Sequence, residues 1–329
     1  MRYLLRRLGF FLLTLWAALT LNFFLPHFMP GSPINSLRAA TRGKVPDAEL
    51  KKILASYGFK PDANLFSQYW DYLGKMLTGD FGVSTGGSSL GQPVSKMIGQ
   101  SLPWTLGLVG ITTVLAFILG SLIGMVAAWR RGGVVDSVLP SVFVVTSALP
   151  YFVVGLFLIL FFAIDNTWLP ASFNYDNTIV PGLSPGFIGS VLQHALLPAA
   201  TLLITSIGGW VLTMRNNMIT TLAEDYIRMG RAKGLSDRKV MYHYAARNAF
   251  LPNLSGFAMS IGFVLTGAIL VERIFNYPGL GYELYNAVNS IDYPMMQALF
   301  LLFTMAVLGA ILVCDLLTVW LDPRTRAKG

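Results

Sequence analysis

Long apolar stretches alternate with polar segments along the whole chain. Six of them, at residues 8–25, 104–129, 138–164, 191–214, 254–271 and 298–321, are long enough to cross about 30 Å of hydrocarbon as helices. The second and third contain no charged residue at all. The pattern therefore predicts an all-α, polytopic membrane protein with six transmembrane helices.

Residues 31–102, between the first two apolar stretches, are too polar to span a membrane. Apolar positions at helical spacing predict two amphipathic helices here. The first presents Leu50, Ile53, Leu54 and Tyr57 and is closed by Gly58; the second presents Phe66, Tyr69, Trp70, Leu73, Met76 and Leu77. These helices predict a small extracytoplasmic region, and such faces suit core or membrane-interface packing better than a ligand site.

The distribution of basic residues predicts the orientation in the membrane. Lys and Arg gather at 2–7, 130–131, 215–247 and 324–328, whereas the connection between the third and fourth stretches has none and the next outer one has only Arg273. Cytoplasmic segments carry the excess of positive charge, so both termini are expected in the cytoplasm. The segment 26–30 lacks a small-residue cleavage site, so the first stretch is predicted to be an uncleaved helix of a multi-pass protein.

Composition agrees with a membrane protein and excludes several chemistries. The chain has 54% hydrophobic and 12% charged residues, and its mean hydropathy is +0.59. The net charge of +8 follows from the sidedness of the basic residues, so no nucleic-acid partner is expected. One Cys and three His provide no metal cluster, and no phosphate-binding G-x-x-x-x-G-K-[ST] loop occurs. We therefore expect no cofactor or catalytic site in this chain, and any ATP-derived energy must come from another subunit.

Residues 223–254 form the most informative polar segment. They contain six of the 24 Lys and Arg residues of the chain and lie between two apolar stretches, so the segment is expected in water. Tyr226, Met229 and Lys233 follow a helical spacing, and Glu224 and Asp225 occupy the first turn, where carboxylates favour the helix dipole.

A turn is predicted directly after this short helix. Gly234 suits a left-handed C-cap, and Ser236 can cap a second helix, with Lys239 in the place of the acid of a capping box. The second helix then continues through Leu251 and Pro252 into the next apolar stretch.

This segment resembles the cytoplasmic loop of permease subunits in ATP-binding cassette (ABC) importers, where a short coupling helix docks on the ATPase. The strings Tyr-Ile-Arg, Ala-Lys-Gly-Leu and Arg-Asn-Ala-Phe-Leu-Pro are similar to those of the dipeptide and oligopeptide branch. The Glu-Ala-Ala triplet of the superfamily is replaced by Arg228-Met229-Gly230. The resemblance implies that the ATPase-coupling residues are Glu224, Tyr226, Arg228, Met229, Arg231, Ala232, Lys233, Gly234 and Asp237.

Further motifs of that family occur outside the loop. They are Gly-Asp-Phe-Gly at 79–82, Val-Glu-x-Ile-Phe-x-x-Pro-Gly-Leu-Gly at 271–281, Asp-Tyr-Pro at 292–294 and Leu-Asp-Pro-Arg at 321–324. The second of these implies an outer gate loop with Glu272, Phe275, Pro278, Gly279 and Gly281. Asp315 is expected to pair within the bundle, with a coupling role as the alternative.

Residues that line a path are less clearly marked. Pro150 interrupts the third stretch beside Ser147 and Tyr151, where a kink would serve either a translocation path or packing alone. Thr205 and Trp210 belong to a row of polar and aromatic positions, one turn apart, that is expected to face the bundle interior. Candidate path-lining residues are therefore Ser147, Tyr151, Thr205 and Trp210.

The resemblance implies the type I ABC importer permease fold and a location in the bacterial inner membrane. The expected divisions are 1–30 for the first helix, 31–102 for the extracytoplasmic region, 103–321 for the permease core with a coupling loop at 215–252, and 322–329 for a cytoplasmic tail. The implied partners are a homologous second permease, two cytoplasmic ATPases that bind ATP and Mg, an extracytoplasmic substrate-binding protein and the lipid bilayer. Peptides are the expected cargo, with oligosaccharides or nickel as alternatives; a stand-alone secondary transporter and a membrane-anchored scaffold are the other classes considered.

Overall fold

The computed structural model describes residues 2–57, 63–86, 89–266 and 268–321. Its described secondary structure is helical, apart from an isolated bridge between Val83 and Pro93. The elements are α1 (Arg2–Phe28), α2 (Pro33–Ala40), α3 (Asp47–Ser56), α4 (Leu65–Thr78), α5 (Val94–Thr105), η2 (Leu106–Gly110), α6 (Ile111–Trp129), α7 (Val134–Ala148), α8 (Tyr151–Leu158), η3 (Ile159–Asp165), α9 (Pro185–Leu222), α10 (Asp225–Ala232), α11 (Asp237–Lys239), η4 (Val240–Ala246), α12 (Arg247–Val264), α13 (Ile269–Ile274), α14 (Leu280–Ser290) and α15 (Tyr293–Leu321).

The prediction of an all-α membrane protein is confirmed, with corrections to the individual spans. Four described helices are long and apolar enough to cross a membrane: Arg7–Phe28, Val94–Trp129, Pro185–Leu222 and Tyr293–Cys314. The predicted third span is divided, because the chain bends by 92° between α7 and α8. Pro150 follows Leu149, whose extended backbone ends α7, so the predicted kink is a sharp break rather than a bend within one helix.

The predicted fifth span is wrong at its end. It was expected to reach residue 271, but α12 stops at Val264 and α13 begins only at Ile269. The Thr266 hydroxyl donates to the Phe263 carbonyl at 2.6 Å, and the Thr266 N–H donates to the same oxygen, which closes the last turn of α12. Apolar residues continue on both sides of Thr266, so hydropathy alone could not locate the break.

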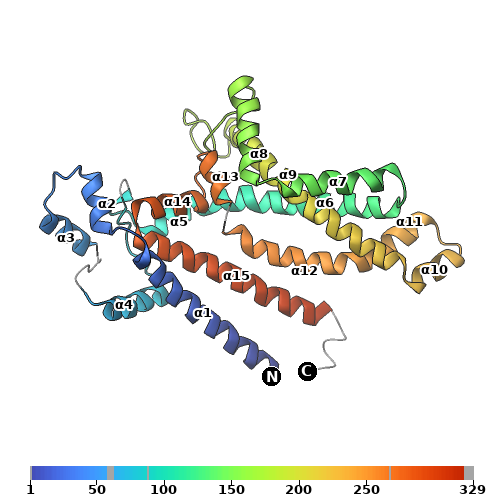
Figure 1. The fold of residues 1–329 in the computed structure, drawn as a ribbon, viewed down its shortest axis with the longest axis horizontal. Helices are drawn as coiled ribbons and strands as arrows, with labels where there is room; N and C mark the ends of the chain where they lie inside the picture. Colours follow the sequence, from blue (N-terminus) through green and yellow to red (C-terminus); the bar gives the residue numbers. More distant parts are fainter. Residues whose placement is uncertain (1, 58–62, 87–88, 267, 322–329) are drawn as a thin grey trace.

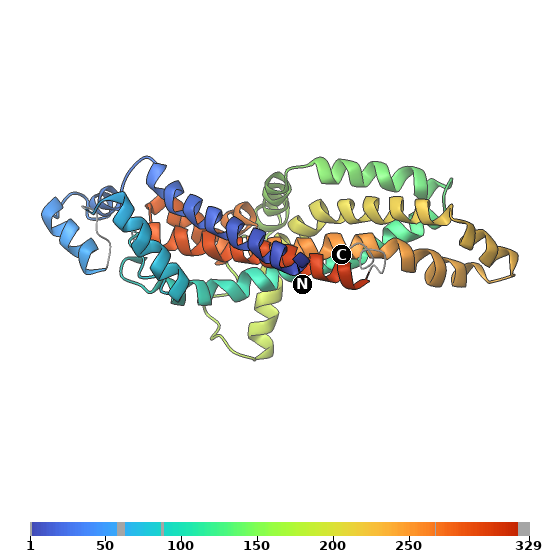
Figure 2. The ribbon, with the colours of Figure 1, turned by 90° about the horizontal axis from the view of Figure 1, so that it is seen from below.

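Small residues bring α6 and α9 into close contact. The predicted stripe of Gly120, Gly124, Ala127 and Ala128 is buried. A Cβ atom on Gly124 would lie 2.4 Å from the Val211 carbonyl oxygen, and one on Gly120 would lie 3.0 Å from the Ile207 carbonyl oxygen. The backbones therefore approach closely, as small-residue stripes permit in membrane helices. The views in Figures 1 and 2 show the two helices crossing in the middle of the molecule.

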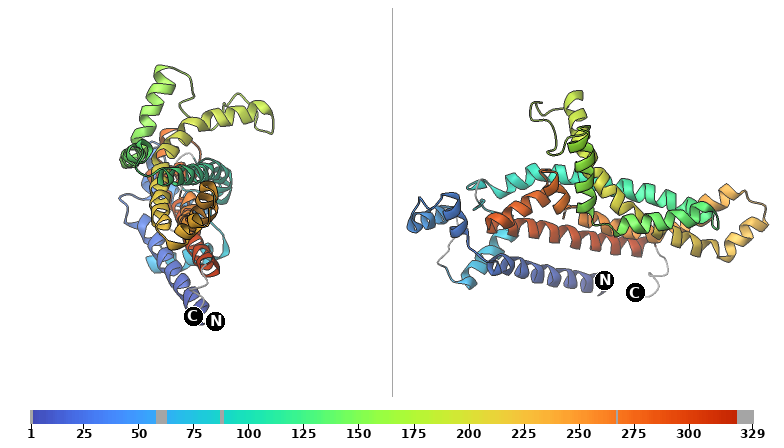
Figure 3. Two further views of the ribbon diagram at one scale, coloured as in Figure 1. Left: turned by 90° about the vertical axis from the view of Figure 1, so that its right-hand side faces the viewer. Right: turned by 45° about the horizontal axis from the view of Figure 1, so that its top comes forward.

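The molecule is elongated, with its smaller helices at the two ends. Figure 1 shows α10 and α11 at one end of the long axis and α2, α3 and α4 at the other. Helix α15 runs beside α1 and α12. Helix α8 and the start of α9 project sideways from this bundle (Figure 3).

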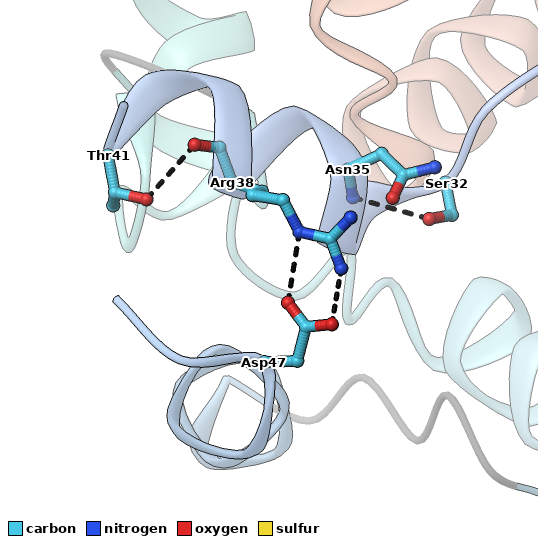
Figure 4. Close-up of polar contacts among 5 residues, drawn as sticks. All are labelled: Ser32, Asn35, Arg38, Thr41 and Asp47. Carbon is cyan, nitrogen blue, oxygen red and sulfur yellow. Dashed lines mark hydrogen bonds and ion pairs between the residues drawn. The ribbon is translucent and has the colours of Figure 1, made fainter. Parts of the chain in front are cut away.

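Helices α2 and α3 form a small unit at the end opposite α10. Buried Leu37, Leu50 and Leu54 form its core, so the predicted apolar face of α3 is confirmed at Leu50 and Leu54, whereas Tyr57 is exposed. Arg38 of α2 donates from Nε to the Asp47 carboxylate at 2.9 Å and pairs with its second oxygen (Figure 4). Both side chains are exposed, so this pair orients the two helices but adds little stability. The predicted closure at Gly58 lies outside the described residues.

Helix α4 buries only part of its predicted apolar face. Leu73 and Met76, together with Tyr72, pack against Leu19 and Phe23 of α1. Of the rest of the predicted face, Tyr69 is half-buried, and Phe66, Trp70 and Leu77 are exposed.

Candidate functional site

The segment after α9 is a helical hairpin anchored to the bundle by a buried cluster. Ile227 of α10 is 1% exposed and packs with Met218 of α9, Val240 and Met241 of η4, and Ala249 of α12. The structure continues α9 to Leu222, so the first eight residues of the predicted loop 215–252 are helical. The hairpin is therefore a rigid extension of α9 and α12 (Figure 1).

The predicted glycine C-cap is confirmed. Gly234 has φ +76° and its N–H donates to the Arg231 carbonyl at 2.9 Å, while the Leu235 N–H donates to the Gly230 carbonyl at 3.3 Å. This pair of bonds is the Schellman pattern that closes a helix before a left-handed residue. Ser236 occupies the N-cap position of α11 as predicted, but its side chain makes no capping bond.

The predicted coupling residues lie mostly on the exposed side of the hairpin, and the residue that anchors α10 is not among them. Ile227 is the anchor of α10, whereas Met229 is 58% exposed. Arg231 lies over the Trp129 ring, 5.3 Å from its centroid, and the Tyr226 hydroxyl accepts a bond from the Asn248 amide at 2.8 Å. The exposed members of the predicted set are Glu224, Arg228, Met229, Arg231, Ala232, Lys233, Gly234 and Asp237.

The predicted outer gate loop folds around one buried carboxylate. Glu272 of α13 is 0% exposed. Its Oε2 accepts from the Tyr282 N–H at 3.0 Å, the Gly281 N–H also donates to the carboxylate, and its Oε1 accepts from the Thr105 hydroxyl at 2.9 Å. Thr105 in turn accepts from the Leu280 N–H at 2.7 Å. The first three N–H groups of α14 are thus satisfied by two side chains from other elements.

The two glycines of this motif make room for that carboxylate. A Cβ atom on Gly279 would lie 2.4 Å from the carboxyl carbon of Glu272, and one on Gly281 would lie 2.9 Å from Oε2. Glu272, Gly279 and Gly281 therefore form one unit. Their shared motif predicted that they belong together but not that Glu272 caps α14. The available signal was an acid a few residues before a Pro-Gly turn that starts a helix.

The other two predicted gate residues are placed differently. Phe275 is buried against α8 and α9, where its ring lies close to Gly155 and Thr201. Its carbonyl also accepts from the Phe173 N–H at 2.8 Å. Pro278 is half-buried and has no part in the carboxylate network.

A second buried acid joins two motifs that are distant in sequence. Asp292 accepts from the Thr85 N–H at 3.0 Å, from the Ser84 and Thr85 hydroxyls, and from the Met295 N–H at 3.4 Å. It therefore caps α15 and holds the loop that follows the Gly-Asp-Phe-Gly motif. Both motifs are evident in the sequence, but nothing in their spacing predicts this contact.

Burial dominates the titration of these acids. It raises the pKa of Glu272 above its ordinary value, although bonds from Thr105 and backbone N–H groups act against the rise. The same cause raises the pKa of Asp292 and of Glu283, whose carboxylate accepts from the Ser101 hydroxyl at 3.3 Å. Burial also raises the pKa of Tyr277 to about 12.

Three of the predicted path-lining residues share one cavity. Ser147, Tyr151 and Thr205 line a space of about 490 Å³ at the break between α7 and α8. Its other polar lining residues are Thr112, Thr113 and Ser206, and the remainder are apolar. The threonine hydroxyls donate to carbonyls of their own helices, so their remaining lone pairs can accept bonds from a polar guest.

Trp210 does not belong to this cavity. Its ring packs edge-on against Phe117 at 5.2 Å and lies near Phe257 and Gly256. The side chain joins α6, α9 and α12, so the structure assigns it a packing role. The predictions for the Asp315 side chain and for Asp322, Pro323 and Arg324 lie outside the described residues.

A comparison with known families decides the class of this protein. The model of the family described as binding-protein-dependent transport system inner membrane component matches residues 120–327. The chain belongs to this family. It is a multi-pass transport permease, and the matched region includes the hairpin, the cavity-lining residues of α7 to α9, and both buried acids.

Curated relatives of the permease match over nearly its whole length. The dipeptide transport system permease protein DppB of Lactococcus lactis subsp. cremoris is 33% identical over 327 residues, 99% of each chain. The glutathione transport system permease protein GsiC of Salmonella typhimurium is 32% identical over 330 residues, 100% of each. The oligopeptide transport system permease protein AppB of Bacillus subtilis is 31% identical over 323 residues, 98% of each.

Proposed function

We propose that this permease is one transmembrane subunit of an ATP-driven, binding-protein-dependent importer of short peptides. Relatives named for dipeptide, oligopeptide and glutathione transport match 98% or more of its length, and glutathione is itself a modified tripeptide. The chain supplies no ATP site of its own in this proposal. ATP and Mg bind to two ATPase partners, and an extracytoplasmic binding protein delivers the cargo.

The anchored hairpin supports coupling to an ATPase. Helix α10 and its C-cap residue Lys233 expose Met229 and three basic side chains, while Ile227 fixes the helix to the bundle. An exposed apolar side chain ringed by charges suits a groove on a partner protein. Movement of the partner would pass to α9 and α12, because both continue directly into the hairpin.

The lining of the cavity supports a peptide cargo over nickel. Nickel requires imidazole, thiolate or carboxylate ligands, whereas the lining offers hydroxyls, backbone and aromatic or aliphatic surface. A peptide backbone carries donors and acceptors that match hydroxyl groups, and an uncharged wall accepts varied side chains. The lining hydroxyls could also bind an oligosaccharide, so a transport assay is used to distinguish the two cargoes.

The projecting arm of α8 and η3 supports pairing with a second permease. Figures 1 and 3 show this arm standing away from the bundle. Its exposed large apolar side chains are Phe152, Leu156, Phe157, Leu160, Phe161 and Ile164. We propose that a homologous subunit packs against it and completes the translocation path around the cavity.

The proposed topology follows the charge distribution. Both termini and the hairpin lie in the cytoplasm of a bacterial inner membrane, and the region 31–102, with α13 and α14, lies on the opposite side. The core begins near residue 103, although helix Val94–Trp129 is continuous across that division.

The proposal is tested with the complete importer in proteoliposomes that contain ATP. We expect uptake of a labelled dipeptide or tripeptide, and no uptake of a maltooligosaccharide or nickel. ATP-dependent uptake of a sugar or of nickel, with peptides inert, would overturn the cargo assignment. Uptake by the permease alone, without ATPase subunits, would overturn the importer assignment.

Coupling through α10 is tested by the double charge reversal Arg231→Glu with Lys233→Glu. We expect the ATPase subunits to be lost on purification and uptake to fall, while membrane insertion is retained. The matched control reverses Lys44 and Lys52, two exposed lysines at the other end of the molecule. Equal ATPase recovery from both variants would contradict docking on α10.

A further inference from the structure

Helix α4 has three distinct faces rather than the two of an ordinary surface helix. At 100° per residue, Phe66, Trp70 and Leu77 fall within about 40° of one another. They are 71%, 57% and 76% exposed. The buried face with Tyr72 and Met76 lies on one side of this apolar stripe.

A polar stripe occupies the remaining surface of α4. Ser67, Asp71, Lys75 and Thr78 are exposed and lie within about 80° of one another, and the centre of this stripe is about 120° around the helix from that of the apolar stripe. A helix with one apolar and one charged exposed face is suited to the boundary between water and hydrocarbon.

Contacts with α1 place α4 at the level of the membrane. The Tyr69 hydroxyl bonds to the Thr20 hydroxyl at 2.8 Å, and Gln68 bonds to His27 at 3.2 Å. Helix α1 spans with Arg7–Phe28, about 33 Å long. Thr20 lies about 12 Å along the helix from Phe28, so α4 packs against a part of α1 that is inside the bilayer rather than beyond it.

Aromatic rings connect the exposed stripe of α4 to the exposed surface of α1 without a break. Phe28, which is exposed at the end of α1, stacks on Phe24 at 5.9 Å, and Phe24 stacks on Tyr69 at 6.4 Å. Tyr69 meets Trp70 at 5.7 Å, and Trp70 meets Phe66 at 6.0 Å. Such belts of aromatic rings mark the membrane interface.

We propose that α4 is an interfacial helix whose Phe66, Trp70 and Leu77 side chains insert into the leaflet at the C-terminal end of α1. The apolar stripe contacts lipid, because it is continuous with the membrane-facing surface of a spanning helix. The polar stripe with Asp71 and Lys75 then faces water. Through Gly79 and the loop held by Asp292, this helix fixes the region 31–102 to the bilayer surface.

Spin labels at neighbouring positions test the assignment in the assembled importer. Single cysteines replace Phe66 and Leu77 on the apolar stripe, and Ser67 and Thr78 on the polar stripe, in a Cys314→Ala background. The matched pairs differ by one residue and about 100° around the helix. The importer is placed in nanodiscs of phosphatidylethanolamine and phosphatidylglycerol, and accessibility to oxygen and to a water-soluble nickel chelate is measured.

Lipid insertion predicts a reversal within each pair. Labels at 66 and 77 should be relaxed at least several-fold more by oxygen than by the nickel chelate, and labels at 67 and 78 should show the opposite order. If the two labels of each pair were equally accessible to the water-soluble nickel chelate, the proposal would be overturned in favour of a helix in water. Protection of 66 and 77 from both reagents would overturn it in favour of a protein partner, such as the second permease.

Discussion

Removal of the Glu272 side chain tests whether one carboxylate holds the start of α14. Glu272→Ala leaves the Gly281 and Tyr282 N–H groups without their acceptor in a site that water does not reach. Each buried unsatisfied donor costs about 1–3 kcal/mol. The substitution also removes the desolvation penalty of the buried carboxylate, which offsets part of this loss. We therefore expect local stability to fall by about 2–4 kcal/mol at this site.

Hydrogen exchange measured by mass spectrometry locates the effect. Because 1.36 kcal/mol corresponds to a tenfold change, amides of 280–284 should exchange about 30-fold to 1000-fold faster in the purified importer. Glu272→Gln keeps the volume and one acceptor oxygen, so its effect should be about 1 kcal/mol. The control Glu49→Ala removes an exposed acid from the first turn of α3 and should stay within about 0.5 kcal/mol.

The reasoning also requires coupling between Glu272 and Thr105. Thr105→Val removes the acceptor of the Leu280 N–H, and the double variant should cost less than the sum of the two single ones by more than about 0.5 kcal/mol. The capping role would be refuted if amides 280–284 of Glu272→Ala exchanged at the wild-type rate. It would also be refuted if the stability losses of Glu272→Ala and Thr105→Val were strictly additive in the double variant.

Three other sites are tested by single substitutions: a close helix contact, a turn and a buried acid. Gly124→Ala drives a methyl group into the Val211 carbonyl, so we expect a loss of about 1–3 kcal/mol and a lower melting temperature of the importer. Gly234→Pro cannot adopt φ +76° and removes an N–H donor, so ATPase subunits should no longer copurify although the chain still inserts. Burial raises the pKa of Glu283, so the native state keeps this proton at pH values where the unfolded chain has lost it. The stability of the fold therefore falls as pH rises above the ordinary carboxyl pKa of 4.5. Glu283→Gln cannot titrate, so its melting temperature should fall less than that of the wild type between pH 5 and 8.

Each of these has a control and a contradicting result. Gly107 has open space around its Cα, so Gly107→Ala should leave the melting temperature unchanged; equal losses at 107 and 124 would reject the close contact. Full recovery of ATPase subunits with Gly234→Pro would reject the role of the turn. An unchanged pH profile in Glu283→Gln would show that this carboxylate is not the group that titrates, and Asp292 or Glu272 would have to account for the slope.

Local features of the hairpin could be predicted because their causes are local. Gly234 ends α10 since only glycine enters the left-handed region without strain, and the residues on either side fix the turn. The anchor of α10 was harder to predict. Met229 and Ile227 are both apolar, and the position of Val240 and Met218 in the fold decides that Ile227 is buried.

Features that depend on distant residues were not accessible from the sequence. Pro150 indicated a break in the third span, but its 92° angle depends on the packing of α8 against α9 and α13. Trp210 was assigned to the path by its helical spacing with Thr205, and it instead meets Phe117 from another helix. The capping of α14 likewise joins residues 105 and 272, which no periodicity connects.

The course of α9 gives the permease a mechanical property. Its 38 residues form one helix, with Pro198 inside it, that leads directly into α10. The start of this helix projects sideways from the bundle, whereas the part that leads to α10 packs along α6 (Figure 3). Close backbone contacts at Gly120 and Gly124 hold that second part against α6. A displacement imposed at α10 is therefore carried along the packed part, past Thr205 and its cavity, to the region of Pro198, where a helix bends most readily.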